Sequence, residues 1–405
     1  MKSTLLEQEK PASAVSAPAI DAALVWLMAI TCGLVVANIY YNQPLLADIG
    51  NTFHLSDSKV SLIATATQIG YTLGLFLVVP LGDKVERKRL ILLKLLCAAA
   101  AMALAAFAPS FVVLVVASVL IGIFSAVPQL LIPMAASLAN DEDRGRIVGK
   151  VMSGLLIGIL LSRTISGYVG AHFGWRTMFW AGSAAMVVLT GVLALKLPTS
   201  RPSFTGTYAS LMKSLVSLTR DLQPLRRAAL VGGFLFAGFS VFWTTLVFFL
   251  EGSPYHYGSD VVGFFGLIGA CGALAAPLAG KAADKKGPDY AIRIGLLLAL
   301  AAYAILGFGG YHLAGLVVGV IILDVGVQAT HISNQSSIFA LIPEARSRLN
   351  TVYMTAYFIG GSLGSLAGGF AWANAGWAGV SATGFSFVLA AFLINQLYRR
   401  KQQAR

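Results

Sequence analysis

Long apolar runs recur along the whole chain and dominate its pattern of hydrophobic and polar positions. Each run holds about 20 residues, the length that a helix needs to cross a bilayer core of roughly 30 Å. The alternation of apolar and polar residues that is typical of membrane β-strands is absent. The pattern predicts an all-α membrane protein with twelve transmembrane helices. We expect them at 22–44, 59–81, 89–108, 110–138, 146–170, 176–196, 228–250, 260–280, 290–308, 313–339, 347–371 and 377–397.

An internal repeat divides these helices into two groups of six. The residues Glu142, Arg144, Arg146, Met152, Gly158, Gly167, Gly174 and Trp175 return, each 202 positions later, as Glu344, Arg346, Arg348, Met354, Gly360, Gly369, Gly376 and Trp377. A constant offset of half the chain predicts two halves built on one plan. The two halves differ at two equivalent positions: Arg163 corresponds to Ser365, and Asp324 corresponds to Gly122.

The repeat and the polar stretches predict the domain limits. We expect a disordered tail over 1–20, six-helix bundles over 21–196 and 228–398, a linker over 197–227 and a short tail over 399–405. Within the linker, Tyr208, Leu211, Leu215, Leu218 and Leu222 recur at helical spacing, which favours an amphipathic helix on the membrane surface. A loosely ordered loop is the alternative.

Composition agrees with a membrane protein, because 57% of the residues are hydrophobic, 11% are charged and the mean hydropathy is +0.78. The net charge of +12 could indicate nucleic-acid binding, but the Lys and Arg residues cluster in loops on one side of the predicted spans. Only Lys59 and Arg176 fall in loops on the other side. The positive-inside rule therefore predicts a multi-pass protein of the bacterial inner membrane with both termini in the cytoplasm. We interpret Arg89 and Lys94 as such topological charges.

No residue pattern indicates a cofactor or an enzyme. Cys32, Cys97 and Cys271 lie inside apolar runs without the spacing of a disulfide framework or a zinc site. A nucleotide-binding loop, a metal cluster and a nucleophile triad are also absent from the sequence. We expect neither catalysis nor ATP hydrolysis on this chain.

Two charged loops carry a family resemblance. The first contains Asp83, Lys84, Arg87 and Lys88, and the second contains Gly280, Asp284, Lys285 and Gly287. The two loops are separated by nearly the half-chain offset. Both resemble the loop motif of the Major Facilitator Superfamily. The resemblance implies two six-helix bundles around a central cavity that opens alternately to each side of the membrane. It also implies that Asp83 stabilises the state that is closed at the cytoplasmic side.

Two ionisable residues interrupt the apolar runs. An ionised side chain at a helix centre costs about 2.5 to 3.5 kcal/mol on insertion scales, so Arg163 and Asp324 are functional candidates. On one helical face, Asp324 is followed by Gln328, His331 and Gln335. We expect Asp324 and His331 to carry a proton between states. A structural pair of Arg163 and Asp324 is the alternative.

Other polar and aromatic residues lie in helices that the resemblance assigns to the cavity wall. The substrate-cavity candidates are Asn38, Tyr41, Asn42, Gln68, Gln129, Trp243, Gln328 and Gln335. Amides and aromatic rings among apolar residues suit a small amphipathic solute. For each residue, a hydrogen bond between helices is the alternative.

These observations predict a secondary active transporter, similar to the drug–proton antiporter and sugar-efflux branch of the superfamily. We expect proton-coupled export of a small organic molecule by a monomer in the bilayer, without nucleic acid. Ser118 stands where such exporters carry an arginine, which keeps a facilitator or a proton symporter for a sugar, amino acid or nucleoside open. A receptor or scaffold that transports nothing is a more distant alternative.

Overall fold

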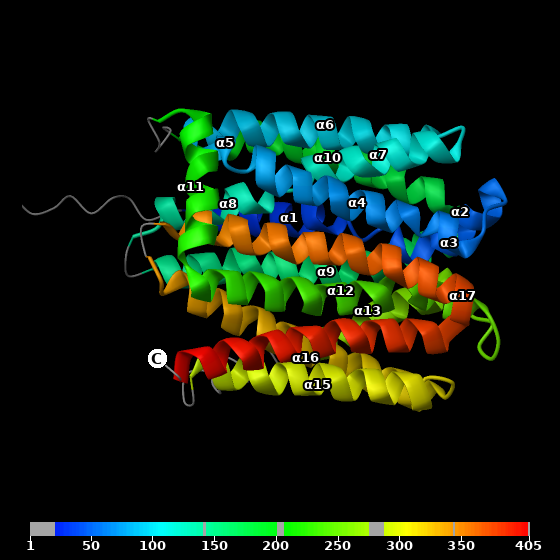
Figure 1. Ribbon diagram of the computed structural model, residues 1–405. Coiled ribbons are helices and arrows are strands. Elements are labelled where there is room, and N and C mark those ends of the chain that lie inside the picture. Colours follow the sequence, from blue (N-terminus) through cyan, green and yellow to red (C-terminus); the bar gives the residue numbers. More distant parts are fainter. Residues whose placement is uncertain (1–20, 141–142, 201–205, 275–286, 343–344, 404–405) are drawn as a thin grey trace, which may run out of the picture.

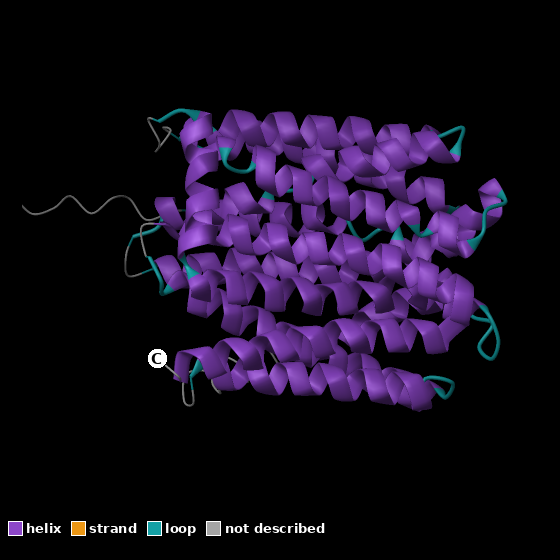
Figure 2. Ribbon diagram, in the orientation of Figure 1, coloured by secondary structure: helices purple, strands orange, loops and turns teal. Residues whose placement is uncertain are grey.

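Every element that the structure describes is a helix (Figure 2). The computed structural model describes residues 21–140, 143–200, 206–274, 287–342 and 345–403. In this part of the chain, nine helices are long and apolar enough to cross a membrane. Two shorter apolar helices, Ala22–Ala37 and Ser259–Gly269, lie where the sequence predicts further spans. The predicted all-α membrane fold is therefore confirmed.

The first half of the chain runs from α1 to α10. Its elements are α1 (Ala22–Ala37), η1 (Gln43–Leu45), α2 (Leu46–Phe53), α3 (Asp57–Val60), α4 (Leu62–Leu73), the π-helical turn η2 (Gly74–Val78), α5 (Leu81–Lys84), α6 (Arg87–Phe107), α7 (Phe111–Phe124), α8 (Pro128–Leu138), α9 (Arg144–Phe173) and α10 (Trp175–Lys196). The linker helix α11 (Tyr208–Asp221) follows. The second half holds α12 (Gln223–Glu251), α13 (Ser259–Leu274), α15 (Pro288–Gly309), α16 (Leu313–Phe339) and α17 (Arg346–Gln403).

The repeated Gly-Trp pair marks equivalent corners of the two halves. Gly174 separates α9 from α10 at φ +82°, and Gly376 divides α17 at φ +54°. A side chain would be strained at such a positive φ, so glycine is required for the chain to turn there. Each following tryptophan is held by its indole N–H, with Trp175 donating to Thr52 Oγ1 (3.0 Å) and Trp377 to the Leu306 carbonyl (2.8 Å).

Small residues allow two helix pairs to approach closely. A Cβ atom on Gly33 of α1 would lie 2.6 Å from the Gly154 carbonyl oxygen of α9, and one on Gly364 of α17 would clash with the Ala237 carbonyl oxygen of α12. Both contacts join the first and fifth long helices of their half. Such pairs pack through small residues because lipid supplies no hydrophobic force between helices.

The linker helix lies across one end of the bundle, which we call the α11 end (Figure 1). It buries Leu211 and Leu215, and Tyr208 donates to the Leu77 carbonyl (2.8 Å). The carboxyl terminus lies at this end, whereas α2 and α3 lie at the opposite end, which we call the α2–α3 end.

Two predicted spans are broken helices. The run 22–44 is helical only as far as Ala37 before η1 begins at Gln43, and the run 110–138 is divided between Phe124 and Pro128. Proline lacks the backbone N–H needed inside a helix but fits its first turn, which explains why α8 starts afresh at Pro128.

The interpretation of Lys94 as a topological charge was wrong. Its side chain is 1% exposed inside α6, and Nζ donates to the Ile123 carbonyl (3.0 Å). This carbonyl lies in the last turn of α7, where carbonyl groups lack partners in their own helix. Lys94 therefore stabilises the break in the fourth predicted span.

Candidate functional site

Arg163 of α9 lies at the centre of a buried polar cluster. Its Nε donates to Gln43 Oε1 (2.8 Å) in η1. Its Cζ lies 4.1 Å from the ring centroid of Trp243 in α12 and 4.7 Å from that of Tyr40. The guanidinium is thus stacked on aromatic rings from both halves, an arrangement that stabilises a desolvated cation. Arg163, which the sequence singled out, does lie between the halves.

Three polar atoms in this region have no hydrogen-bond partner in the described part of the chain. They are Arg163 Nη2, Trp243 Nε1 and Asp324 Oδ2, and each is buried. A buried polar atom without a partner costs about 1 to 3 kcal/mol, more when it is charged. Although Asp324 interacts electrostatically with Arg163, no ion pair within 4 Å joins the two among the described residues. The two sequence candidates are neighbours without being a closed pair.

Glycines of α13 hold this cluster together. A Cβ atom on Gly269 would lie 3.1 Å from the Trp243 ring and 3.2 Å from Asp324 Oδ2, and one on Gly266 would lie 2.9 Å from the Arg163 Cβ. The bare backbone of α13 therefore touches all three polar side chains. These spacer glycines were missed in the sequence, although their spacing of three residues was the available signal.

A second polar group joins the halves beside the first. Gln68 Nε2 of α4 donates to Ser365 Oγ of α17 (2.8 Å), and Ser365 also shares a hydrogen bond with Thr244 of α12 (2.9 Å). Ser365 is the repeat counterpart of Arg163. Both members of this mismatched pair therefore lie at the contact between the halves, one with a charged and one with a neutral side chain.

A third polar group lies further along α16. The ring Nδ1 of His331 is 3.0 Å from Tyr353 Oη, and the hydrogen-bond chain from Gln335 through Asn350 to Gln129 links α16, α17 and α8. His331 is therefore hydrogen-bonded to Tyr353. No hydrogen bond between His331 and Asp324 occurs in the described segments. Neither Asn350 nor Tyr353 was among the sequence candidates.

The remaining cavity candidates occupy less central places. Asn38 donates to Ser125 Oγ (3.3 Å) and Asn42 to Thr67 Oγ1 (2.8 Å), so both bind within the first half. Tyr41 is buried, and Gln328 is half-buried.

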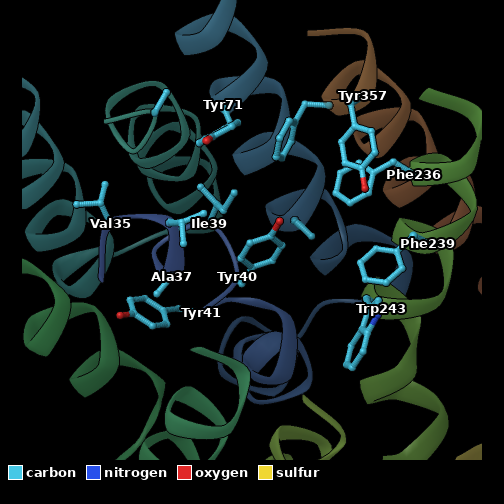
Figure 3. Packing of buried hydrophobic residues seen from close by; sticks show 14 of the residues in the cluster. Val35, Ala37, Ile39, Tyr40, Tyr41, Tyr71, Phe236, Phe239, Trp243 and Tyr357 are labelled. Carbon is cyan, nitrogen blue, oxygen red and sulfur yellow. The ribbon is translucent and has the colours of Figure 1, made fainter. Parts of the chain in front are cut away.

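Aromatic rings separate these polar groups. In Figure 3, Tyr71 and Tyr357 lie on one side of Tyr40, and Trp243 lies on its other side. Tyr71 packs 4.3 Å from Phe358, and Phe236 stacks on Tyr357 with 4.0 Å between centroids. The contact between the halves therefore combines aromatic rings with polar groups.

The loop motif is partly described. Asp83 forms an ion pair with Arg87 (3.0 Å), and Arg87 Nε donates to the Gly82 carbonyl (3.1 Å). Lys84 is exposed and Lys88 half-buried. In the second copy, Gly287 precedes α15 as its N-cap residue at φ +86°, whereas Gly280 and Asp284 lie outside the described residues.

Contacts between the halves close the α2–α3 end. Trp372 Nε1 of α17 donates to Asp57 Oδ2 of α3 (2.7 Å), and Thr164 Oγ1 of α9 donates to the Gly263 carbonyl of α13 (2.9 Å). The Asp48 carboxyl of α2 interacts with Ser259. Burial raises the pKa of Asp48, and the Ser259 hydroxyl opposes that shift.

Comparison with known proteins assigns the family. A model described as Major Facilitator Superfamily matches residues 26–365 and 271–405. An uncharacterized transporter of Escherichia coli O157:H7, YgaY, is 43% identical over 93% of this chain and 95% of its own length. The probable transporter SCO4007 of Streptomyces coelicolor is 31% identical over 88% of this chain and 83% of its own.

Solved structures share the fold at low identity. An inward-facing bacterial homolog of the human lysosomal transporter Spinster superposes with a TM-score of 0.77 at 16% identity, covering 93% of this chain and 95% of that one. The nucleoside transporter NupG superposes with a TM-score of 0.73 at 14% identity, covering 93% of this chain and 99% of that one.

Proposed function

The chain belongs to the Major Facilitator Superfamily and is a membrane transporter, and from this premise we propose that it exports a small amphipathic organic molecule in exchange for protons. The α11 end faces the cytoplasm of a bacterial inner membrane in this proposal, and a monomer forms the complete site. The structure then represents the state whose outer end is closed.

The three unpartnered polar atoms carry the proposal. Arg163 Nη2 and Trp243 Nε1 are donors, whereas Asp324 Oδ2 is an acceptor. A solute with a carboxylate or another acceptor oxygen would satisfy the two donors, since a guanidinium binds carboxylates strongly. The aromatic rings around the cluster would contact its apolar body. Such a solute would supply the missing hydrogen bonds and so remove the free-energy cost of burying these atoms without partners.

Asp324 is the proposed proton carrier. A buried carboxylate without an ion-pair partner is costly in its charged form, so uptake of a proton stabilises it. A solute group that donates a hydrogen bond to Asp324 Oδ2 requires the charged carboxylate, so solute and proton compete for Asp324. This competition is what the exchange of solute for protons requires. His331, bonded to Tyr353, would serve as a relay towards the α11 end.

The alternating movement would use the contacts already described. Opening the α2–α3 end requires the Trp372–Asp57 and Thr164–Gly263 hydrogen bonds to break while the α11 end closes. Asp83, which is paired with Arg87 inside the first half in this state, would help to hold the α11 end closed in the other state. Gly167 of α9 packs closely against Gly263 of α13, and Gly369 of α17 packs against Ser61, so these glycines give close surfaces over which the halves could rock.

The first experiment is a ligand screen on the purified protein. Organic anions, amphipathic drugs, sugars, amino acids, nucleosides and peptides are tested for a rise in melting temperature, because a ligand that binds the folded state stabilises it. An amphipathic anion should stabilise the wild type and should lose most of this effect with Arg163→Gln. Stabilisation by a sugar or a nucleoside that is independent of Arg163 would contradict the proposed solute chemistry.

Direction is measured with the same solute in inside-out vesicles. An exporter accumulates solute in these vesicles when their interior is acidified, whereas a symporter loses it under the same gradient. Transport unaffected by the gradient would indicate the facilitator alternative.

A further inference from the structure

A cavity of about 580 Å³ lies between the linker helix and both halves of the molecule. Its wall is formed by Phe76 of η2 from the first half, Val216 of α11, and Ile359 of α17 from the second half. Val216 and Ile359 are 62% and 47% exposed, so the lining is apolar and open to the surroundings of the helix bundle. An apolar side chain exposed next to a cavity favours an apolar occupant.

Two arginines line the same cavity. Arg220 lies in the last turn of α11 and is exposed, and Arg226 lies in the first turn of α12. Arg226 Nη1 donates to the Thr219 carbonyl (3.2 Å) and contacts the Arg220 carbonyl, which fixes its guanidinium at the end of α11. In the described part of the chain, no acidic side chain lines this cavity. Its charge is therefore positive.

A buried hydroxyl adds a polar group to the wall. Thr355 lines the cavity, and its Oγ1 has no hydrogen-bond partner among the described residues. An unpartnered hydroxyl in the wall of a cavity that holds two arginines is suited to an oxyanion once its side chain turns into the cavity, because each group can donate to an anionic oxygen.

A second cavity continues from the first. It has a volume of about 310 Å³ between α12 and α17, and it shares Ala356 and Ile359 with the first cavity. Gly233 contributes bare backbone, and Leu363 is 54% exposed. Every described residue that lines this second cavity is apolar or glycine, so the cavity forms a slot for a hydrocarbon chain.

We propose that the two cavities together bind one anionic phospholipid. Its phosphate lies against Arg220, Arg226 and Thr355, and one acyl chain follows the slot between α12 and α17. The combination of positive charge at one end and a continuous apolar slot at the other fits an anionic lipid better than a free phosphate or a neutral lipid. Such a lipid would hold α11 against both halves. This site is separate from the Arg163 cluster and does not depend on the transported solute.

Native mass spectrometry of the full chain in detergent tests the proposal. Phosphatidylglycerol and phosphatidylcholine with identical acyl chains are added separately. Phosphatidylglycerol should bind at least fivefold more tightly, since one basic residue near an anionic lipid contributes about 1 kcal/mol. Equal affinity of the two lipids for the wild type would overturn the proposal without any variant.

Variants then locate the site. Arg220→Gln should weaken phosphatidylglycerol about fivefold and leave phosphatidylcholine unchanged, whereas Arg220→Lys should keep the preference. Lys213→Gln, on α11 but outside the cavity, is the matched charge control. Ile359→Trp fills the junction of the two cavities and should weaken both lipids. An equal effect of Arg220→Gln and Lys213→Gln, or normal binding in Ile359→Trp, would refute the site.

Discussion

The hydrogen bond from Trp372 to Asp57 offers a direct test of how the α2–α3 end is held closed. Trp372→Phe removes one indole N–H and keeps an aromatic ring near Phe248 and Phe249, whose centroids lie 6.2 and 6.3 Å from that of Trp372. A hydrogen bond to a charged acceptor contributes about 1.5 to 3 kcal/mol when protected. Asp57 is exposed, which lowers the value to about 1 kcal/mol. The ratio of open to closed molecules at this end should therefore rise about fivefold.

Electron–electron distance measurements can detect this shift. Spin labels replace the exposed residues Lys59 and Ala373, one in each half, in a background without other cysteines. Trp372→Phe should increase the population at long distance. The control is Trp180→Phe, an exposed tryptophan of α10 that packs on Phe107. A distribution that is unchanged in Trp372→Phe, or changed as much by the control, would refute the reasoning.

Two further predictions concern buried polar groups. The pKa of Asp48 is raised in the closed state, so its protonated form favours this state at low pH, and that stability is lost as the pH rises through the raised pKa. Asp48→Asn should flatten the pH dependence of the same distance distribution, and an unchanged dependence would argue against this role. Lys94→Met leaves the Ile123 carbonyl without its donor and should lower the free energy of unfolding by about 1 to 3 kcal/mol, measured by chemical denaturation. Lys88→Met is the control, and equal effects of both would contradict a special role for Lys94.

Hydropathy and the repeat predict the helical architecture because both depend on one-dimensional periodicity. The same methods cannot show that a helix is interrupted: residues Asn38 to Asn42 and Ser125 to Val127 lie in runs whose mean hydropathy is that of a continuous span. Lys94 illustrates a related difficulty. One charge near the end of an apolar run looks like a loop residue until the carbonyl that it binds is known.

The candidate site was predictable in its charges but not in their partners. Arg163 and Asp324 are conspicuous because ionisable residues are rare in apolar spans. Gln43, which binds Arg163 from 120 positions away, carries no such signal. His331 shares a helical face with Asp324, yet periodicity does not show which neighbour a side chain contacts, and the structure engages it with Tyr353.

The proton-carrying role of Asp324 is the central claim, and Asp324→Asn tests it in reconstituted vesicles by comparing two modes of transport. Exchange of labelled for unlabelled solute at equal pH requires solute binding and alternating access but no net proton movement. Accumulation driven by a pH gradient requires a residue that takes up and releases the proton. We predict that Asp324→Asn retains exchange and loses gradient-driven accumulation. Accumulation at the wild-type level in this variant would contradict the account.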